Sequence, residues 1–185
     1  MLKAGPVAMA RPDASRGFTL VEILVVMAIL TILSAMAAPV MADMVVRYRI
    51  DSLRTDLMQS MQQARAEALA RGNTVTLRRV TGCATPLVDA KDWSCGWTAF
   101  VDMDADGLEE AGDTRLQVVS VPPGTRLRKA TDPAETQQFN QFAQAVILGQ
   151  RFELSPADTS YVALAGSLCF STGTRLRYKP GTGPC

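Results

Sequence analysis

Residues 18–40 are apolar almost without interruption, and the polar exceptions are Thr19, Glu22, Thr31 and Ser34. Twenty helical residues rise about 30 Å, which is the thickness of the hydrocarbon core of a bilayer. The segment therefore predicts a membrane-spanning helix. A core helix of a soluble protein is the alternative, but such helices are usually shorter and need a larger protein around them.

The pattern changes after residue 40, where apolar residues recur every three or four positions. This spacing forms one stripe along a helix, and its members are Met41, Val45, Tyr48, Leu53, Leu57, Met61, Ala64 and Ala68. Gly72 and Asn73 follow as a typical helix end. We therefore expect residues 41–72 to continue the first helix as an amphipathic segment, so that one helix runs from residue 18 to residue 71.

From residue 73 onwards, β-branched and aromatic runs predict strands. The predicted strands cover residues 74–78, 97–101, 115–121, 125–128, 145–154 and 160–164, followed by a hairpin of 168–170 with 174–178. Residues 129–143 are rich in polar side chains, and we expect them to form a weakly structured loop. The expected fold class is α+β, in which a long N-terminal helix packs on an antiparallel sheet formed by residues 73–185.

Glu22 is the anomaly of the apolar segment. An isolated carboxylate near the centre of a bilayer costs about 2–4 kcal/mol, and such residues usually have a functional partner. Cleavage of the chain after Gly17 would place a positive α-amino group on Phe18, one helical turn from Glu22. In an assembly, the same amine could pair with Glu22 of a neighbouring copy and fix the register between subunits.

A family resemblance starts at this point of the chain. Its motif is the run Gly17-Phe18-Thr19-Leu20-Val21-Glu22, preceded by Arg16. The run resembles the processing motif of type IV prepilins and type II secretion pseudopilins. The resemblance implies that residues 1–17 are a leader, that prepilin peptidase cuts after Gly17 and methylates Phe18, and that Glu22 sets the assembly register. The leader carries a net charge of about +2 and should stay cytoplasmic.

Four further segments resemble the GspH/FimT family of pseudopilins and minor pilins. They are residues 64–68, 71–77, 96–102 and 168–170. The resemblance implies a pilin-like fold, a single pass through the bacterial inner membrane and a periplasmic C-terminal domain. It also implies a filament of pilins or pseudopilins, an inner-membrane assembly platform as partner, and a minor subunit near the tip. Both the type IV pilus and the type II secretion pseudopilus fit these residues.

Composition narrows the chemistry. The chain contains no histidine, which removes histidine triads and the commonest general base, and we expect no enzymatic activity. Its formal net charge is +1, so that no strong bulk attraction to nucleic acid or anionic lipid is expected. The four cysteines lack zinc-site spacing and favour disulfides in an exported domain. Three pairings remain open, and we favour the two local ones, Cys83–Cys95 and Cys169–Cys185.

Acidic residues follow the second predicted strand with the alternation of a calcium loop, which requires a glycine at its sixth position. The candidate ligands are Asp102, Asp104, Asp106, Glu110 and Asp113, with Gly107 at the sixth position. The flanking segments are predicted strands rather than helices, and the last position is Asp rather than Glu. A solvated acidic turn is therefore the alternative. Apart from calcium, we expect no cofactor.

Basic residues alternate near the C-terminus. Arg175, Arg177 and Lys179 fall on one face of a predicted strand and could contact phosphates of DNA. In the FimT branch, a C-terminal Gly-Arg-x-Arg pattern is implicated in DNA uptake, but here Thr174 separates Gly173 from the first arginine. A solvated edge strand is the alternative.

A third functional class also remains open. Residues 35–37 resemble an ordinary signal-peptide cleavage site. Cleavage there would remove Glu22 and release a soluble periplasmic binding domain. The motif at residues 17–22 would then have no role.

Overall fold

The computed structural model describes residues 18–132, 135–147, 149–170 and 175–185. The chain divides into two compact units, residues 1–41 and 42–185, and each is described by itself. Helix α1 (Leu20–Arg71) contributes to both units. It begins two residues later than predicted, at Leu20, and ends where Gly72 adopts a positive φ of 67°. The predicted stop signal is therefore the observed one.

The amphipathic stripe of α1 is buried over only part of its predicted length. Leu53, Leu57 and Met61 are fully buried, and Ala64 and Ala68 continue the buried face. The first three predicted members point to solvent, because the domain core starts only at Ile50. They are Met41, Val45 and Tyr48, with 61%, 44% and 73% of their surfaces exposed.

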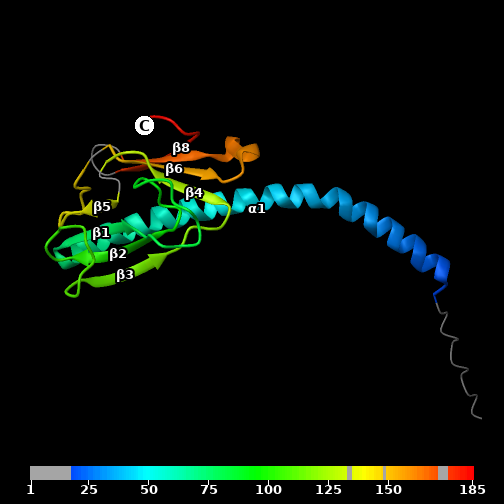
Figure 1. The fold of residues 1–185 in the computed structure, drawn as a ribbon, viewed down its shortest axis with the longest axis horizontal. Helices are drawn as coiled ribbons and strands as arrows, with labels where there is room; N and C mark the ends of the chain where they lie inside the picture. The colour runs from blue at the N-terminus through cyan, green and yellow to red at the C-terminus, as the bar shows by residue number, and fades with distance from the viewer. Residues whose placement is uncertain (1–17, 133–134, 148, 171–174) are drawn as a thin grey trace, which may run out of the picture. The chain divides into compact units, whose positions relative to one another are not determined.

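Two four-stranded antiparallel sheets take the place of the single sheet that we predicted (Figure 1). The first has the order β3-β2-β1-β5, formed by Thr114–Val119, Trp97–Asp102, Thr74–Arg79 and Thr136–Phe139. The second has the order β4-β6-β7-β8, formed by Thr125–Lys129, Arg151–Pro156, Gly166–Phe170 and Leu176–Pro180. The turn at residues 122–124 separates β3 from β4, because neither proline can donate a ladder hydrogen bond.

Strand β5 lies in the segment that we expected to be a weakly structured loop. It pairs with β1 in the register Val75↔Phe139 to Arg78↔Thr136. Gln137 and Phe139 alternate inward, and Phe139 is fully buried. The prediction was wrong because polar residues can hold an edge strand through backbone bonds, with one aromatic residue as an anchor.

Two further predicted strands differ from the structure. The strand expected over residues 145–154 is β6, which begins only at Arg151. The segment expected as a strand over residues 160–164 is a 3₁₀ helix, η1 (Thr159–Leu164). Asp158 starts η1, because its carboxylate accepts a hydrogen bond from the Ser160 N–H at 2.9 Å. The tip predicted for the hairpin of β7 and β8 lies outside the described residues.

One apolar core joins α1 to both sheets. Its centre is aromatic: the rings of Trp93 and Phe152 meet edge to face with centroids 5.2 Å apart. Phe139 and Phe170 extend this cluster, with centroids 6.2 Å apart. The domain is thus an α+β fold in which the C-terminal part of one helix lies against antiparallel strands.

Candidate functional site

The first turn of α1 holds the predicted assembly residue. Thr19 precedes the helix, and its hydroxyl accepts a hydrogen bond from the Glu22 N–H at 3.2 Å. The Ile23 N–H donates to the Thr19 carbonyl, also at 3.2 Å, which makes Thr19 the N-cap. Thr19 and Glu22 have the spacing of a capping box, and an acid in the first turn is stabilised by the helix dipole. Sequence reasoning missed Thr19 as the N-cap, although the Thr-x-x-Glu pattern is present in the sequence.

The apolar residues that follow Glu22 are not buried. All described side chains of residues 18–37 are exposed in the isolated chain. By length and composition, α1 is long and apolar enough to cross a membrane, and its most apolar stretch is not buried. An exposed apolar surface of this size marks a contact with lipid or with another protein.

The predicted processing site is only partly described. Gly17 lies outside the described residues, whereas Phe18 is described and 79% exposed. Within the described ranges, no cation forms an ion pair with the Glu22 carboxylate. The Glu22 carboxylate thus lies at the start of the exposed apolar segment, where a partner from outside the described chain can reach it.

Two disulfides close local loops, and both follow the favoured pairing. Cys83–Cys95 joins the segment after β1 to the segment just before β2, with Cα atoms 5.6 Å apart. Cys169–Cys185 ties the C-terminal segment to β7, with Cα atoms 5.8 Å apart. Each disulfide limits the freedom of a segment in the unfolded chain.

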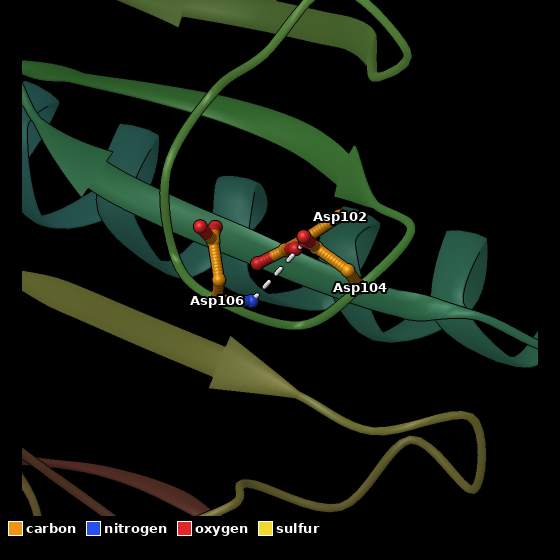
Figure 2. A group of neighbouring side chains, drawn as sticks. All are labelled: Asp102, Asp104 and Asp106. Carbon is orange, nitrogen blue, oxygen red and sulfur yellow. Dashed lines mark hydrogen bonds between the residues drawn. The ribbon is translucent and has the colours of Figure 1, made fainter.

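The five acidic residues proposed as calcium ligands separate into two groups. A carboxylate oxygen of each of Asp102, Asp104 and Asp106 lies within 4.8 Å of the others (Figure 2). Asp113 is used differently, because its carboxylate accepts hydrogen bonds from the backbone N–H groups of Met103 at 3.2 Å and Glu110 at 2.9 Å. The spacing of a calcium loop thus predicted five neighbouring carboxylates, whereas the structure groups three of them. Glu110 is not one of the three.

The basic residues lie on the edge strand β8 and next to it. Arg175, Arg177 and Lys179 are exposed, while Leu176 and Tyr178 between them are half-buried. The alternation predicted from the sequence is present. The Lys179 ammonium donates to the Pro184 carbonyl at 3.0 Å.

Lys129 is a polar core residue that sequence reasoning missed. It ends β4, where Thr125 and Leu127 also point inward, and its side chain is 1% exposed. Its ammonium donates to the Thr136 carbonyl and lies 5.8 Å from the centroid of the Phe152 ring. Burial lowers the pKa of Lys129 to about 7. Continued by one residue, the period-two alternation of the strand predicted over residues 125–128 could have placed this lysine inside.

Pilin-like proteins are a class defined by a long helix that begins with an apolar segment and carries an acid in its first turn. The C-terminal part of the same helix packs against antiparallel sheets. The chain belongs to the GspH family, because the family model described as type II transport protein GspH matches residues 54–177. The prokaryotic N-terminal methylation motif matches residues 13–38. The family comprises minor pilins and pseudopilins, which are structural subunits that assemble with others of their kind in filaments.

Two solved structures of a minor pilin share the fold of this chain. Two crystal forms of the type IV minor pilin FimU of Pseudomonas aeruginosa superpose with TM-scores of 0.55 and 0.53, each at 16% identity. They cover 75% and 73% of this chain, and 94% and 96% of FimU. The minor pseudopilin EpsH of the type 2 secretion system of Vibrio cholerae gives a TM-score of 0.45 at 12% identity, covering 68% of this chain and 92% of EpsH. No curated protein sequence matches the chain significantly.

Proposed function

We propose that the chain is a minor subunit of a type II secretion pseudopilus or a type IV pilus, made as a precursor and processed before assembly. Prepilin peptidase removes residues 1–17 and methylates the new amine of Phe18. The apolar part of α1 holds the subunit in the inner membrane in a single pass, with residues 73–185 in the periplasm. An assembly platform then transfers the subunit into the filament, at or near its tip.

One observation carries this proposal: Glu22 lies at the start of an apolar helical segment, residues 20–37, whose described side chains are all exposed. In lipid, its carboxylate requires a partner. The amine of a processed Phe18 supplies that partner, either within the same subunit or from the next one. The remaining apolar surface then becomes the contact between helices in the filament.

The test has two stages. The chain is first expressed with and without prepilin peptidase, and the mature N-terminus is read by mass spectrometry. Loss of residues 1–17 together with one added methyl group is expected only with the peptidase. A chain that remains intact from Met1 would contradict the proposal, and a start near Ala38 would favour the soluble periplasmic domain instead.

The second stage compares two glutamates of the same helix. Glu22→Ala is expected to abolish crosslinking to neighbouring subunits while leaving leader cleavage intact. Glu67→Ala is the matched control, because Glu67 lies near the end of α1 and forms a surface pair with Arg71 at 2.7 Å. Equal crosslinking by the Glu22→Ala variant and the parent would remove Glu22 from assembly.

DNA binding is a second candidate function. It is favoured by three basic side chains, Arg175, Arg177 and Lys179, which are exposed at one edge of the second sheet. Binding to duplex DNA should weaken with salt and fall in the Arg175→Ala/Arg177→Ala variant. Arg126→Ala/Arg128→Ala is the control, because β4 forms the opposite edge and Arg128 is paired with Asp89 at 2.8 Å. Equal affinity of the parent and the first variant would exclude this role.

A further inference from the structure

The loop between β2 and β3 places three carboxylates around one point. Asp102 ends β2, and Asp104 and Asp106 follow it at alternate positions. Asp102 is 1% exposed, whereas Asp104 and Asp106 are exposed. Figure 2 shows the side chains of Asp102 and Asp104 close together, with Asp106 across the turn. The cluster thus has one inner and two outer members.

The inner member carries an unsatisfied oxygen. Asp102 Oδ2 accepts hydrogen bonds from the Thr76 hydroxyl at 2.6 Å, the Gly107 N–H at 2.9 Å and the Gln138 side-chain amide at 3.4 Å. Asp102 Oδ1 is also buried, yet it has no hydrogen-bond partner among the described residues. An unpaired buried carboxylate oxygen is costly and requires an explanation, and a bound ion or water supplies one.

The negative charge of the cluster is not neutralised by the protein. In the part of the chain that the structure describes, no lysine or arginine forms an ion pair with any of the three aspartates. Arg78 comes near, but its guanidinium donates to the Gly107 carbonyl at 2.6 Å and pairs with Glu135 at 3.5 Å. Three carboxylates within 4.8 Å therefore repel one another unless a cation joins them.

The loop backbone is held in place independently of any ion. The Gln138 amide donates to the Ala105 carbonyl at 3.2 Å, which ties the turn to β5. Asp113 accepts from the Met103 and Glu110 N–H groups, which fixes the other side of the loop. The three carboxylates are consequently presented on a largely preformed support, which reduces the ordering cost of binding a ligand.

We propose that Asp102, Asp104 and Asp106 bind one calcium ion, with the unpaired Oδ1 of Asp102 as the inner ligand. Calcium accepts six to eight oxygen ligands in flexible geometry, and these include carboxylates, carbonyls and water. Magnesium requires a near-ideal octahedron and gives up its water reluctantly, so it is the poorer fit to one buried and two exposed carboxylates. The bound ion joins the end of β2 to the loop and offsets the negative charge of the three aspartates.

The proposal is tested on the full-length chain in detergent, melted in chelator, in millimolar calcium and in millimolar magnesium. A dissociation constant of about 10⁻⁴–10⁻³ M, typical of extracellular calcium modules, is expected by calorimetry. Calcium at several times that concentration should raise the melting temperature by about 3 °C. No shift with calcium, or an equal shift with magnesium, would overturn the proposal.

Three variants identify the ligands. Asp104→Asn keeps the side-chain oxygen that accepts from the Asp106 N–H at 3.4 Å but removes a charge, so calcium affinity should fall at least tenfold. In chelator, this variant should melt at or above the parent temperature, because repulsion is reduced. Asp106→Asn is a second variant with the same expectation, in case Asp104→Asn does not fold. Glu110→Gln should bind like the parent, and a loss equal to that of Asp104→Asn would overturn the three-aspartate assignment.

Discussion

Helix α1 contains two segments that both carry large apolar side chains but meet different surroundings. Leu53, Leu57 and Met61 are fully buried against the β domain. In residues 20–37, Leu24 and Leu30 are 60% and 52% exposed. Hydrophobicity by itself therefore does not say where a side chain is buried. In the buried segment, polar residues between the apolar ones confine the apolar side chains to one face of the helix. In residues 20–37, apolar side chains surround the helix on all faces.

The largest difference should appear on shortening a leucine in each segment. Leu57→Ala is expected to lower the free energy of unfolding of the β domain by about 3 kcal/mol, because it leaves a cavity in a closed core. Leu24→Ala should change it by less than about 0.5 kcal/mol, since this side chain is 60% exposed. Urea titrations of the detergent-solubilised chain measure both values. Similar losses from the two substitutions would break the distinction between the segments.

A buried charge should make the stability of the domain depend on pH. The pKa of Lys129 is about 7 in the folded chain, against 10.5 for an ordinary lysine. Between these values, the unfolded state binds more protons, so stability rises with pH. We expect a gain of about 2 kcal/mol from pH 7 to pH 9, and a flatter profile for Lys129→Met. Parallel profiles of the parent and the variant would show that the lysine is already charged inside or is not buried.

The cap of α1 should have a smaller and local effect. Thr19→Ala removes the oxygen that accepts from the Glu22 N–H and should cost about 1 kcal/mol in the first turn. Amide hydrogen exchange at Glu22 and Ile23 should accelerate accordingly, while the β domain keeps its stability. Thr19→Ser retains the hydroxyl and serves as the control. Unchanged exchange in the alanine variant would show that the helix start is fixed by other contacts.

The smallest effect is expected on the solvated face of α1. Glu67 and Arg71 form an i,i+4 pair, with 30% and 44% of their side chains exposed. Glu67→Gln should therefore change the free energy of unfolding by less than about 0.5 kcal/mol, and salt should reduce even that. A loss above 1 kcal/mol in the same urea titration would mean that this face is not simply solvated.

The helix and most strands could be predicted because local patterns determine them. The stop at Gly72 and the buried stripe from Leu53 follow from backbone freedom and helical spacing. Strand β5 could not be predicted, because only its pairing with β1 and the burial of Phe139 stabilise it. The 3₁₀ turn at Thr159–Leu164 was missed because the cap at Asp158 outweighed the β-branched residues.

The acidic site shows the same limit. Regular spacing was sufficient to identify Asp102, Asp104 and Asp106 as neighbours. It did not separate Asp113 from them, although the Asp113 carboxylate accepts hydrogen bonds from the loop backbone and lies outside the group of three. The burial of Asp102 depends on β1 and β5, which supply Thr76 and Gln138 from distant parts of the sequence.

The aromatic core also provides an optical reporter. The chain has two tryptophans, Trp93 and Trp97, and both are fully buried beside the disulfide cysteine Cys95. Indole emission should therefore shift to longer wavelength only when the β domain opens, and disruption of the apolar rod of residues 20–37 should leave it unchanged. One fluorescence trace can thus follow the β domain inside a micelle, a vesicle or an assembled filament without any added dye.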